Sequence, residues 1–399
     1  MPEPKPKALR VASIDAFRGM TILTMIFVNE LAGISNIPDW MKHAAAEADT
    51  MTFVDLVFPA FLFIVGMSIP YAIAARERRG EGKLKIFGHI LLRSVSLLII
   101  GVFMVNTESG YNQEVMSISI YLWALIMYVC VILIWSHYSK GIPQWQKYTL
   151  RLLGILGLLI LFILYKGGDG SGAMQPQWWG ILGLIGWAYF FTCLFYLLFK
   201  TDMIALLTSL GFCIAFYLLM NINGLEPFPS YLAWLQGQSG NASHTAITLS
   251  GLIVSILFSR GLKNQHKHWI LYILGFALFL FIAGFLLRPL HGISKIHASP
   301  TWSLYSAGFC CLIFLLMYLI LDVLGWKRWF KYIEPAASNP LLIYILPYIL
   351  YALLGFIGIA IKPDFMSSGV LGIFWSLLFS IVMMILVALL NKINIRLRL

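Results

Sequence analysis

Long apolar runs separated by short polar gaps organise this chain. A helix that crosses the hydrocarbon core of a bilayer needs about 20 mostly apolar residues, so each run is a candidate membrane span. The fold class that we predict is an all-α integral membrane protein with about 11–12 transmembrane helices. The predicted helices occupy 17–36, 53–75, 86–105, 116–136, 149–165, 179–199, 202–221, 245–260, 269–288, 302–323, 338–361 and 369–391.

The charges in the gaps predict the orientation of these helices. Cytoplasmic gaps of membrane proteins carry an excess of Lys and Arg. Alternate gaps of this chain hold clusters of basic residues, for example at 76–85, 140–151 and 260–267, and the gaps between them hold few. The pattern predicts an even number of helices, with the N- and C-termini both cytoplasmic.

Composition supports a membrane protein and excludes several other classes. Of the 399 residues, 60% are hydrophobic and only 11% are charged, whereas soluble domains carry about 25% charged residues. The net charge of +11 arises from the gaps and does not indicate nucleic acid. The five cysteines lie inside apolar runs without metal-ligand spacing, so no metal is expected. We expect one polytopic domain over 1–399, with the informative motifs in 11–75.

Polar residues at membrane depth are costly and often mark function. Asp15, Arg18 and Asn29 fall on one face of the first predicted helix, at spacings of three and four. This face combines an acid–base pair near the cytoplasmic mouth with an amide deeper in the membrane. Alternatively, Asp15 and Arg18 form an ion pair that only anchors the helix.

A second group of polar residues follows the first helix on the outer side. His43 lies in the string Lys-His-Ala, and Asp55 opens the second helix. Histidine titrates near physiological pH and can act as a general base. Asp55 could orient His43 or could cap the second helix. A solvated loop histidine is the simpler alternative.

Basic residues elsewhere could bind phosphate, because a guanidinium binds phosphate through two parallel hydrogen bonds. Arg93 lies one to two turns above the inner end of the third helix, where it could also extend to the membrane surface. The outer gap after the ninth helix holds Arg288, Lys295 and His297, against the charge pattern.

The outer gap at 222–244 contains no Lys or Arg and is rich in Gly, Pro and aromatic residues. Such a segment suits a lid or the wall of a sugar site. It equally suits an anchor at the membrane interface. His244, its last residue, is a candidate acceptor-binding residue.

The motifs of the first 70 residues closely resemble one enzyme family. The strings SIDAFRGMTILTMIFVNELAG, KHA and TFVDLVFPAFLFIVGMSI resemble the transmembrane heparan-α-glucosaminide N-acetyltransferases. KIHASPTWSLYSAG, near 295–308, and ASNPLLIYI, near 337–345, are weaker echoes of the same family.

This resemblance implies an enzyme that moves an acetyl group from cytosolic acetyl-CoA to the amine of a glucosamine-type sugar on the outer side. It implies that His43 is catalytic, with Asn29 beside it. For the mechanism, we expect the Asn29 amide to stabilise the oxyanion and Asp55 to orient His43 or to bind the acceptor. The expected donor-binding residues are Asp15, Arg18 and Arg93. The expected acceptor-binding residues are His244, Lys295, His297 and Asn339.

Two departures from the family pattern affect the prediction. The lysosomal members have an N-terminal luminal domain, whose absence here favours a bacterial inner membrane. After the histidine this chain reads Ala44-Ala45-Ala46-Glu47, where members tend to read Ser-Trp-Asn-Gly, which bears on the acceptor more than on the donor. The expected partners are acetyl-CoA, the acceptor sugar and the bilayer. A homodimer is one expected assembly. An O-acetyltransferase of envelope glycans and a sugar or peptide transporter are the alternative functions.

Overall fold

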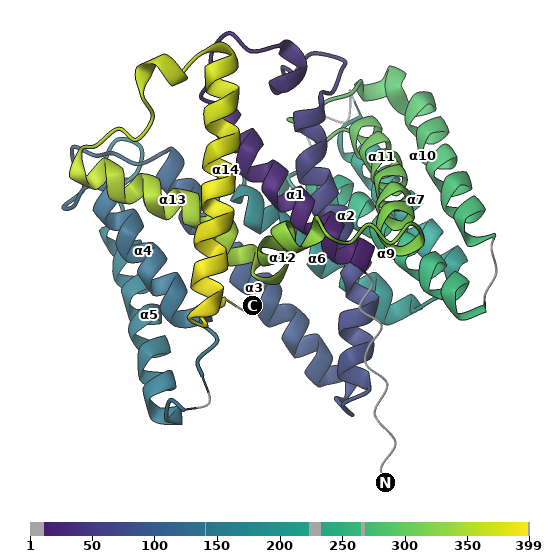
Figure 1. Ribbon diagram of the computed structural model, residues 1–399, viewed down its shortest axis with the longest axis horizontal. Helices are drawn as coiled ribbons and strands as arrows, with labels where there is room; N and C mark the ends of the chain where they lie inside the picture. The colour runs from purple at the N-terminus through teal and green to yellow at the C-terminus, as the bar shows by residue number, and fades with distance from the viewer. Residues whose placement is uncertain (1–11, 140, 223–232, 265–267, 398–399) are drawn as a thin grey trace.

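The computed structural model describes residues 12–139, 141–222, 233–264 and 268–397, which form a bundle of helices (Figure 1). Twelve helices of 16 residues or more build the described part of the bundle. They are α1 (Ala12–Leu31), α2 (Phe53–Glu77), α3 (Lys83–Glu108), α4 (Ile120–Trp135), α5 (Gln144–Leu164), α6 (Gly180–Phe199), α7 (Met203–Met220), α9 (Ser239–Asn264), α10 (Trp269–His291), α11 (Pro300–Tyr318), α13 (Pro340–Ile357) and α14 (Gly369–Lys392). Shorter helices are η1 (Asp39–Met41), α8 (Ala233–Gln236), α12 (Phe330–Ser338) and η4 (Asp364–Met366), and a π-helical turn, η3 (Leu319–Val323), extends α11.

Each predicted span coincides with one of these helices, which confirms the all-α membrane class. In the described ranges, ten helices are long and apolar enough to cross a membrane. The other two are α4, which is apolar but has only 16 residues, and α1, which carries the polar residues noted above. The short helix α12 was not predicted, because its nine residues are too few for a span.

The first span was predicted five residues too late. Helix α1 covers Ala12–Leu31 instead of 17–36, because its charged residues are paired within the bundle. Arg18 Nη1 donates to Asp15 Oδ1 at 3.2 Å, and Arg18 Nη2 donates to Ser68 Oγ of α2 at 2.8 Å. Asn29 therefore lies in the last turn of the helix.

The predicted gap at 222–244 is also wrong at its C-terminal end. Residues 223–232 lie outside the described residues, but α9 begins at Ser239, well before the expected 245. Several of its hydroxyl groups bond within the helix, since Thr245 and Thr248 donate to the carbonyls four residues earlier. A polar stretch can thus form a buried helix, and His244 is a helical residue.

The gaps between the helices gather on two faces of the bundle. The gaps predicted to be cytoplasmic contact one another and form what we call the inner face. The remaining gaps contact one another and form the outer face. Inner contacts include Lys200–Glu77, Arg260–Thr201 and His137–Arg396; outer contacts include Ser35–Ser367, Arg288–Asp49 and Tyr217–His297. The alternation of the gaps is thus present in the fold, and which face meets the cytoplasm stays a prediction.

Helix α2 packs tightly against α9 near the middle of the bundle. Gly66 lies against the carbonyl of Thr248, and Gly251 lies against the carbonyl of Phe63, so closely that a Cβ at either glycine would collide with backbone. These two contacts fix α9 against α2, and the polar residues at the outer ends of both helices therefore share one region.

A proline in α2 creates a link to α11. Pro59 has no N–H to donate to the carbonyl of Asp55, four residues earlier. The indole Nε1 of the buried Trp302 donates to this carbonyl at 3.3 Å. The indole thus replaces the hydrogen bond that α2 lacks at Pro59. This contact ties α11 to the outer end of α2.

Candidate functional site

His43 and Asp55 form a hydrogen-bonded pair at the outer face. His43 Nδ1 lies 2.7 Å from Asp55 Oδ1, with the Asp55 side chain buried and the His43 side chain 39% exposed. The other carboxylate oxygen accepts from the backbone N–H groups of Ala44 and Thr52, at 3.2 and 3.1 Å. Asp55 thus fixes both the imidazole and the loop that carries it, and leaves the imidazole accessible from one side.

Lys295 approaches the same imidazole from a distant part of the chain. Its Nζ lies 3.1 Å from Nδ1 and 3.4 Å from Nε2 of His43. Burial lowers the pKa of Lys295, and the charge of Asp55 opposes this shift. The folded protein therefore favours the neutral amine of Lys295 more than water does.

Hydrogen bonds join the loop that carries His43 to the loop that carries Lys295. Asp49 accepts from Arg288 Nε and from the backbone N–H of Ile293, both at 2.8 Å. Ser294 Oγ donates to the Ala46 carbonyl at 2.8 Å. The loop that follows α1 and the loop that follows α10 form one structural unit at the outer face.

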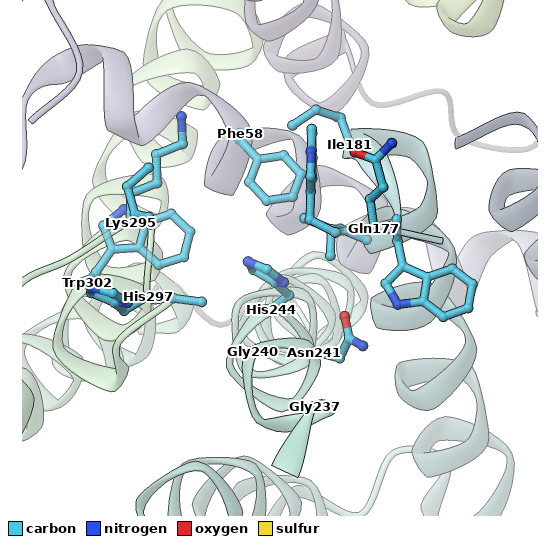
Figure 2. A pocket seen from close by; sticks show the side chains of 15 residues that line it. Phe58, Gln177, Ile181, Gly237, Gly240, Asn241, His244, Lys295, His297 and Trp302 are labelled. Carbon is cyan, nitrogen blue, oxygen red and sulfur yellow. The ribbon is translucent and has the colours of Figure 1, made fainter. Parts of the chain in front are cut away.

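A cavity of about 620 Å³ lies beside this unit (Figure 2). Three of the four predicted acceptor-binding residues, His244, Lys295 and His297, line it. Phe58 of α2 and Ile181 of α6 contribute to its wall. The structure thus brings together residues that lie far apart in the sequence.

His244 and Asn241 reach this outer cavity from one face of α9 (Figure 2). The His244 ring is held edge-on between Phe58 and Trp302, with ring centroids at 5.3 and 5.9 Å. His244 and Asn241 are buried, with relative exposures of 5% and 3%. Nδ1 of His244 and Oδ1 of Asn241 have no hydrogen-bond partner among the described residues.

A second cavity, of about 370 Å³, lies toward the inner face. Two of the predicted donor-binding residues, Arg18 and Arg93, line it together with Ser68 and Tyr189. The Arg93 guanidinium stacks on the Tyr189 ring at 4.8 Å. Nε of Arg93 is buried without a hydrogen-bond partner in the described part of the chain. The inner cavity therefore presents two guanidinium groups from different helices.

Only about one helical turn separates the two cavities along α2. Phe58 lines the outer cavity and Phe61 the inner one, a rise of about 4.5 Å along the helix axis. Helix α6 lines both cavities as well, through Leu184 and Tyr189. The two cavities therefore border neighbouring stretches of the same two helices.

The structure places the remaining predicted residues apart from one another. Asp15 pairs with Arg18 near the inner cavity. Asn29 is exposed in the last turn of α1 and makes no hydrogen bond to the His43–Asp55 pair in the described structure. Its neighbour Glu30 is buried and accepts from Tyr351 and Trp375.

Asn339 lies at the inner face, away from the other predicted acceptor-binding residues. Its side chain bonds to Asn391 and to the backbone of Ile395 and Leu397. These bonds hold the C-terminal segment against the start of α13. The structure therefore does not group Asn339 with His244 and Lys295.

Sequence reasoning missed Asn241 and Trp178 of the outer cavity. Asn241 is three residues before His244, and this spacing would have placed both on one helical face. That signal was hidden because residue 241 was assigned to a gap. For metal binding, no suitable group of three or more His, Cys, Asp or Glu residues occurs within the described ranges.

Comparison with known proteins confirms the resemblance found in the motifs. The chain is 40% identical over 103 residues to the heparan-alpha-glucosaminide N-acetyltransferase of Mus musculus, a match that covers 26% of this chain and 15% of the mouse protein. It is also 40% identical over 98 residues to the enzyme of the same name from Homo sapiens, covering 24% of this chain and 14% of the human protein. The matched segment is thus a small part of each relative.

A protein family described as "Domain of unknown function (DUF5009)" matches residues 10–225. This range is more than half of the chain and runs from α1 into the segment after α7. It holds His43, Asp55 and the arginines of the inner cavity. The chain therefore belongs to the DUF5009 family.

Proposed function

We propose that this protein is a membrane-embedded acetyltransferase that moves an acetyl group from acetyl-CoA at the inner face to an amino sugar at the outer face. The observation that carries the proposal is the pair of cavities along the same two helices, one lined by arginines and the other beside the His43–Asp55 pair. The whole of 1–399 acts as one transmembrane catalytic domain. The similarity to the mouse and human enzymes supports the same reaction class.

The inner cavity binds the donor in this proposal. The nucleotide end of acetyl-CoA carries phosphates that cannot enter a bilayer, and guanidinium groups bind phosphate strongly. Arg93 is the main anion-binding residue, because no carboxylate bonds to it among the described residues. Arg18, held by Asp15, supports it. The inner face is accordingly cytoplasmic.

The acetyl thioester passes from the inner cavity toward the outer one. The pantetheine arm is narrow and uncharged, so it can lie between α2 and α6 where the phosphates cannot. Helix α2 extends about 20 Å from Ser68 in the inner cavity to Asp55 at the outer face. The thioester then reaches the region of His43 while the nucleotide stays behind.

His43 acts as the general base on the acceptor amine. An amine attacks a thioester only in its unprotonated form, and a positioned imidazole can take its proton. Asp55 holds the ring through Nδ1, and Nε2, which lies 3.4 Å from Lys295 Nζ, is the nitrogen that takes the proton. The nitrogen–carbon bond forms, the carbon–sulfur bond breaks, and the proton passes through His43 to the CoA thiolate.

Asn29 donates its side-chain amide to the developing oxyanion in this proposal. Its exposed position in the last turn of α1 leaves the amide free for this task. An acetyl-histidine at His43 is the alternative route for the same residues.

We place the protein in a bacterial inner membrane. The proposed assembly is a homodimer, which crosslinking would test. An O-acetyltransferase would use the same donor half and a hydroxyl acceptor. A transporter would move sugar or peptide without acetyl-CoA. The arginine cavity favours a transferase, because a transporter of neutral sugars has no need of a phosphate site.

The test is acetyl transfer from labelled acetyl-CoA to glucosamine by the purified protein in detergent. Label should appear on the sugar with wild-type protein. If acetyl-CoA binds but no sugar is labelled, the donor half stands and the amino-sugar acceptor is wrong. If acetyl-CoA does not bind, the acetyltransferase function is wrong and transport becomes the leading function.

A further inference from the structure

We propose that the outer cavity recognises the pyranose ring of the acceptor, with His244 and Asn241 as its hydrogen-bonding residues and Trp178 as its stacking surface. The inference rests on the proposed function for the identity of the reaction, but the binding site itself is argued from the cavity alone. His244 and Asn241 act in acceptor binding, separately from the His43–Asp55 pair.

The fold leaves hydrogen-bonding capacity unused at the outer cavity. No hydrogen bond to either ring nitrogen of His244 occurs within the described residues, and Oδ1 of Asn241 is likewise unpaired. A buried polar group without a partner costs about 1–3 kcal/mol. Two such groups, one helical turn apart at one cavity, indicate a ligand that both donates and accepts hydrogen bonds. Sugar hydroxyl groups do both.

The loop that precedes α6 has a strained backbone where it lines the outer cavity. Gln177 and Trp179 have φ of 49° and 71°, in the left-handed region that non-glycine residues rarely adopt. Such strain persists where the surrounding structure enforces it, often at a binding site. Here it presents Trp178, 46% exposed, on the cavity wall.

Buried Asn106 of α3 enforces this strained loop. Its amide donates to the carbonyl of Gln175 at 2.7 Å, and its Oδ1 accepts from Gln177 Nε2 at 3.1 Å. Ser109 adds a further bond to the Gln177 side chain. The loop is therefore rigid before any ligand arrives, which lowers the entropic cost of binding.

The outer cavity combines an aromatic plane with buried polar groups. Binding sites for small molecules are mostly apolar, with a few placed polar groups that fix orientation. A pyranose ring has an apolar C–H face for Trp178 and hydroxyl groups at its rim for His244 and Asn241. Lys295 and His297 lie together on one side of the cavity (Figure 2). Lys295 Nζ contacts the His43 ring, so the reacting amine would point toward that side.

The test is direct binding of glucosamine to the full-length protein in detergent, measured by saturation-transfer NMR titration. The variants are His244→Phe, which keeps the ring packing between Phe58 and Trp302, and Trp178→Ala. Trp145→Ala, which removes an exposed tryptophan at the start of α5, is the matched control. Affinity for acetyl-CoA is measured on the same samples, and thermal unfolding verifies that each variant is folded.

We expect His244→Phe to weaken glucosamine binding about tenfold, as the loss of one or two hydrogen bonds would. We expect a comparable loss for Trp178→Ala, no change for Trp145→Ala, and unchanged acetyl-CoA affinity throughout. Wild-type affinity in folded His244→Phe and Trp178→Ala, or no glucosamine binding by the wild type, would overturn the inference. Failure of acetyl-CoA to bind would instead overturn the proposed function, because the glucosamine titration does not depend on it.

Discussion

The two cavities of this protein share two helices and differ in almost everything else. The inner cavity has guanidinium groups, from Arg18 and Arg93, in an otherwise largely apolar wall. The outer cavity has imidazole, amide, ammonium and indole groups. One set of groups suits phosphates, and the other suits a polar ring and proton transfer. Helices α2 and α6 supply mainly apolar walls to both cavities, and other elements supply the chemistry that distinguishes them. The arginines come from α1 and α3, whereas the outer polar groups come from α9 and from loops.

The two regions also differ in how their charges are held. Arg18 is paired with Asp15, whereas Arg93 rests on an aromatic ring. At the outer face, the buried Asp55 carboxylate forms hydrogen bonds with His43, Ala44 and Thr52. The outer residues are thus held by several hydrogen bonds, whereas no carboxylate bonds to Arg93 among the described residues. The four predictions that follow test this division, beginning with the largest effect.

His43→Ala should separate chemistry from donor binding. General base catalysis contributes about 10²–10⁴-fold, so acetyl transfer should fall by roughly that factor. Acetyl-CoA affinity should not change, because the arginines lie in the other cavity. Transfer rates and acetyl-CoA titrations on one preparation measure both. Full transferase activity in a folded variant would contradict the role of His43.

Arg93→Gln should weaken acetyl-CoA binding while leaving the catalytic histidine in place. Loss of a charge-assisted hydrogen bond to phosphate should raise the KM for acetyl-CoA about 10- to 100-fold, with a smaller effect on the KM for glucosamine. Arg151→Gln is the matched control, since Arg151 also stacks on a tyrosine, Tyr138, but lies outside the inner cavity. Equal effects of the two substitutions would show that Arg93 has no special role.

Asp55→Asn should weaken the orientation of His43 without removing it. We expect kcat to fall about tenfold or more, since a neutral amide no longer stabilises the imidazolium formed during proton transfer. We also expect a lower Tm, because the carboxylate holds the loop through Ala44 and Thr52. A variant with normal kcat and a lowered Tm would reduce Asp55 to a helix cap.

Lys295→Met should produce the smallest change, and one that depends on pH. Burial lowers the pKa of Lys295 from 10.5 in the folded protein. The unfolded chain then binds this proton more tightly, so wild-type stability rises with pH between the folded pKa and 10.5. Methionine carries no charge, so Lys295→Met lacks the cost of burying a charged amine.

At pH 7.5 we therefore expect the Tm of Lys295→Met to exceed that of the wild type by roughly 1–3 °C. The difference should shrink as the pH approaches 10.5. Thermal unfolding in detergent at several pH values measures it. A difference that grows with pH would show that the charged amine is favoured in the fold.

The sequence predicted the helices well because hydropathy is a local property. Every expected span coincides with a helix, and the errors fall where polar residues enter helices. Arg18 of α1 bonds to Ser68 of α2, and the Thr245 hydroxyl of α9 bonds to a carbonyl of its own helix. Both compensations depend on packing or on helix geometry that hydropathy does not register.

The candidate site was predictable only in part. His43 and Asp55 are 12 residues apart, so their contact could be anticipated from the motif. Lys295 reaches His43 from 252 residues away, and nothing local specifies which outer gaps meet. The same limit explains Asn339, whose motif resembled the family but whose side chain holds the C-terminal segment at the inner face.

The central claim is that donor and acceptor occupy opposite faces of one protein. The most direct measurement uses liposomes containing the protein, with glucosamine sealed inside and labelled acetyl-CoA added outside. Molecules inserted with the inner face outward should label the enclosed sugar while the CoA product stays outside, and His43→Ala should abolish this. Labelling only when both substrates are on the same side of the membrane would contradict the account.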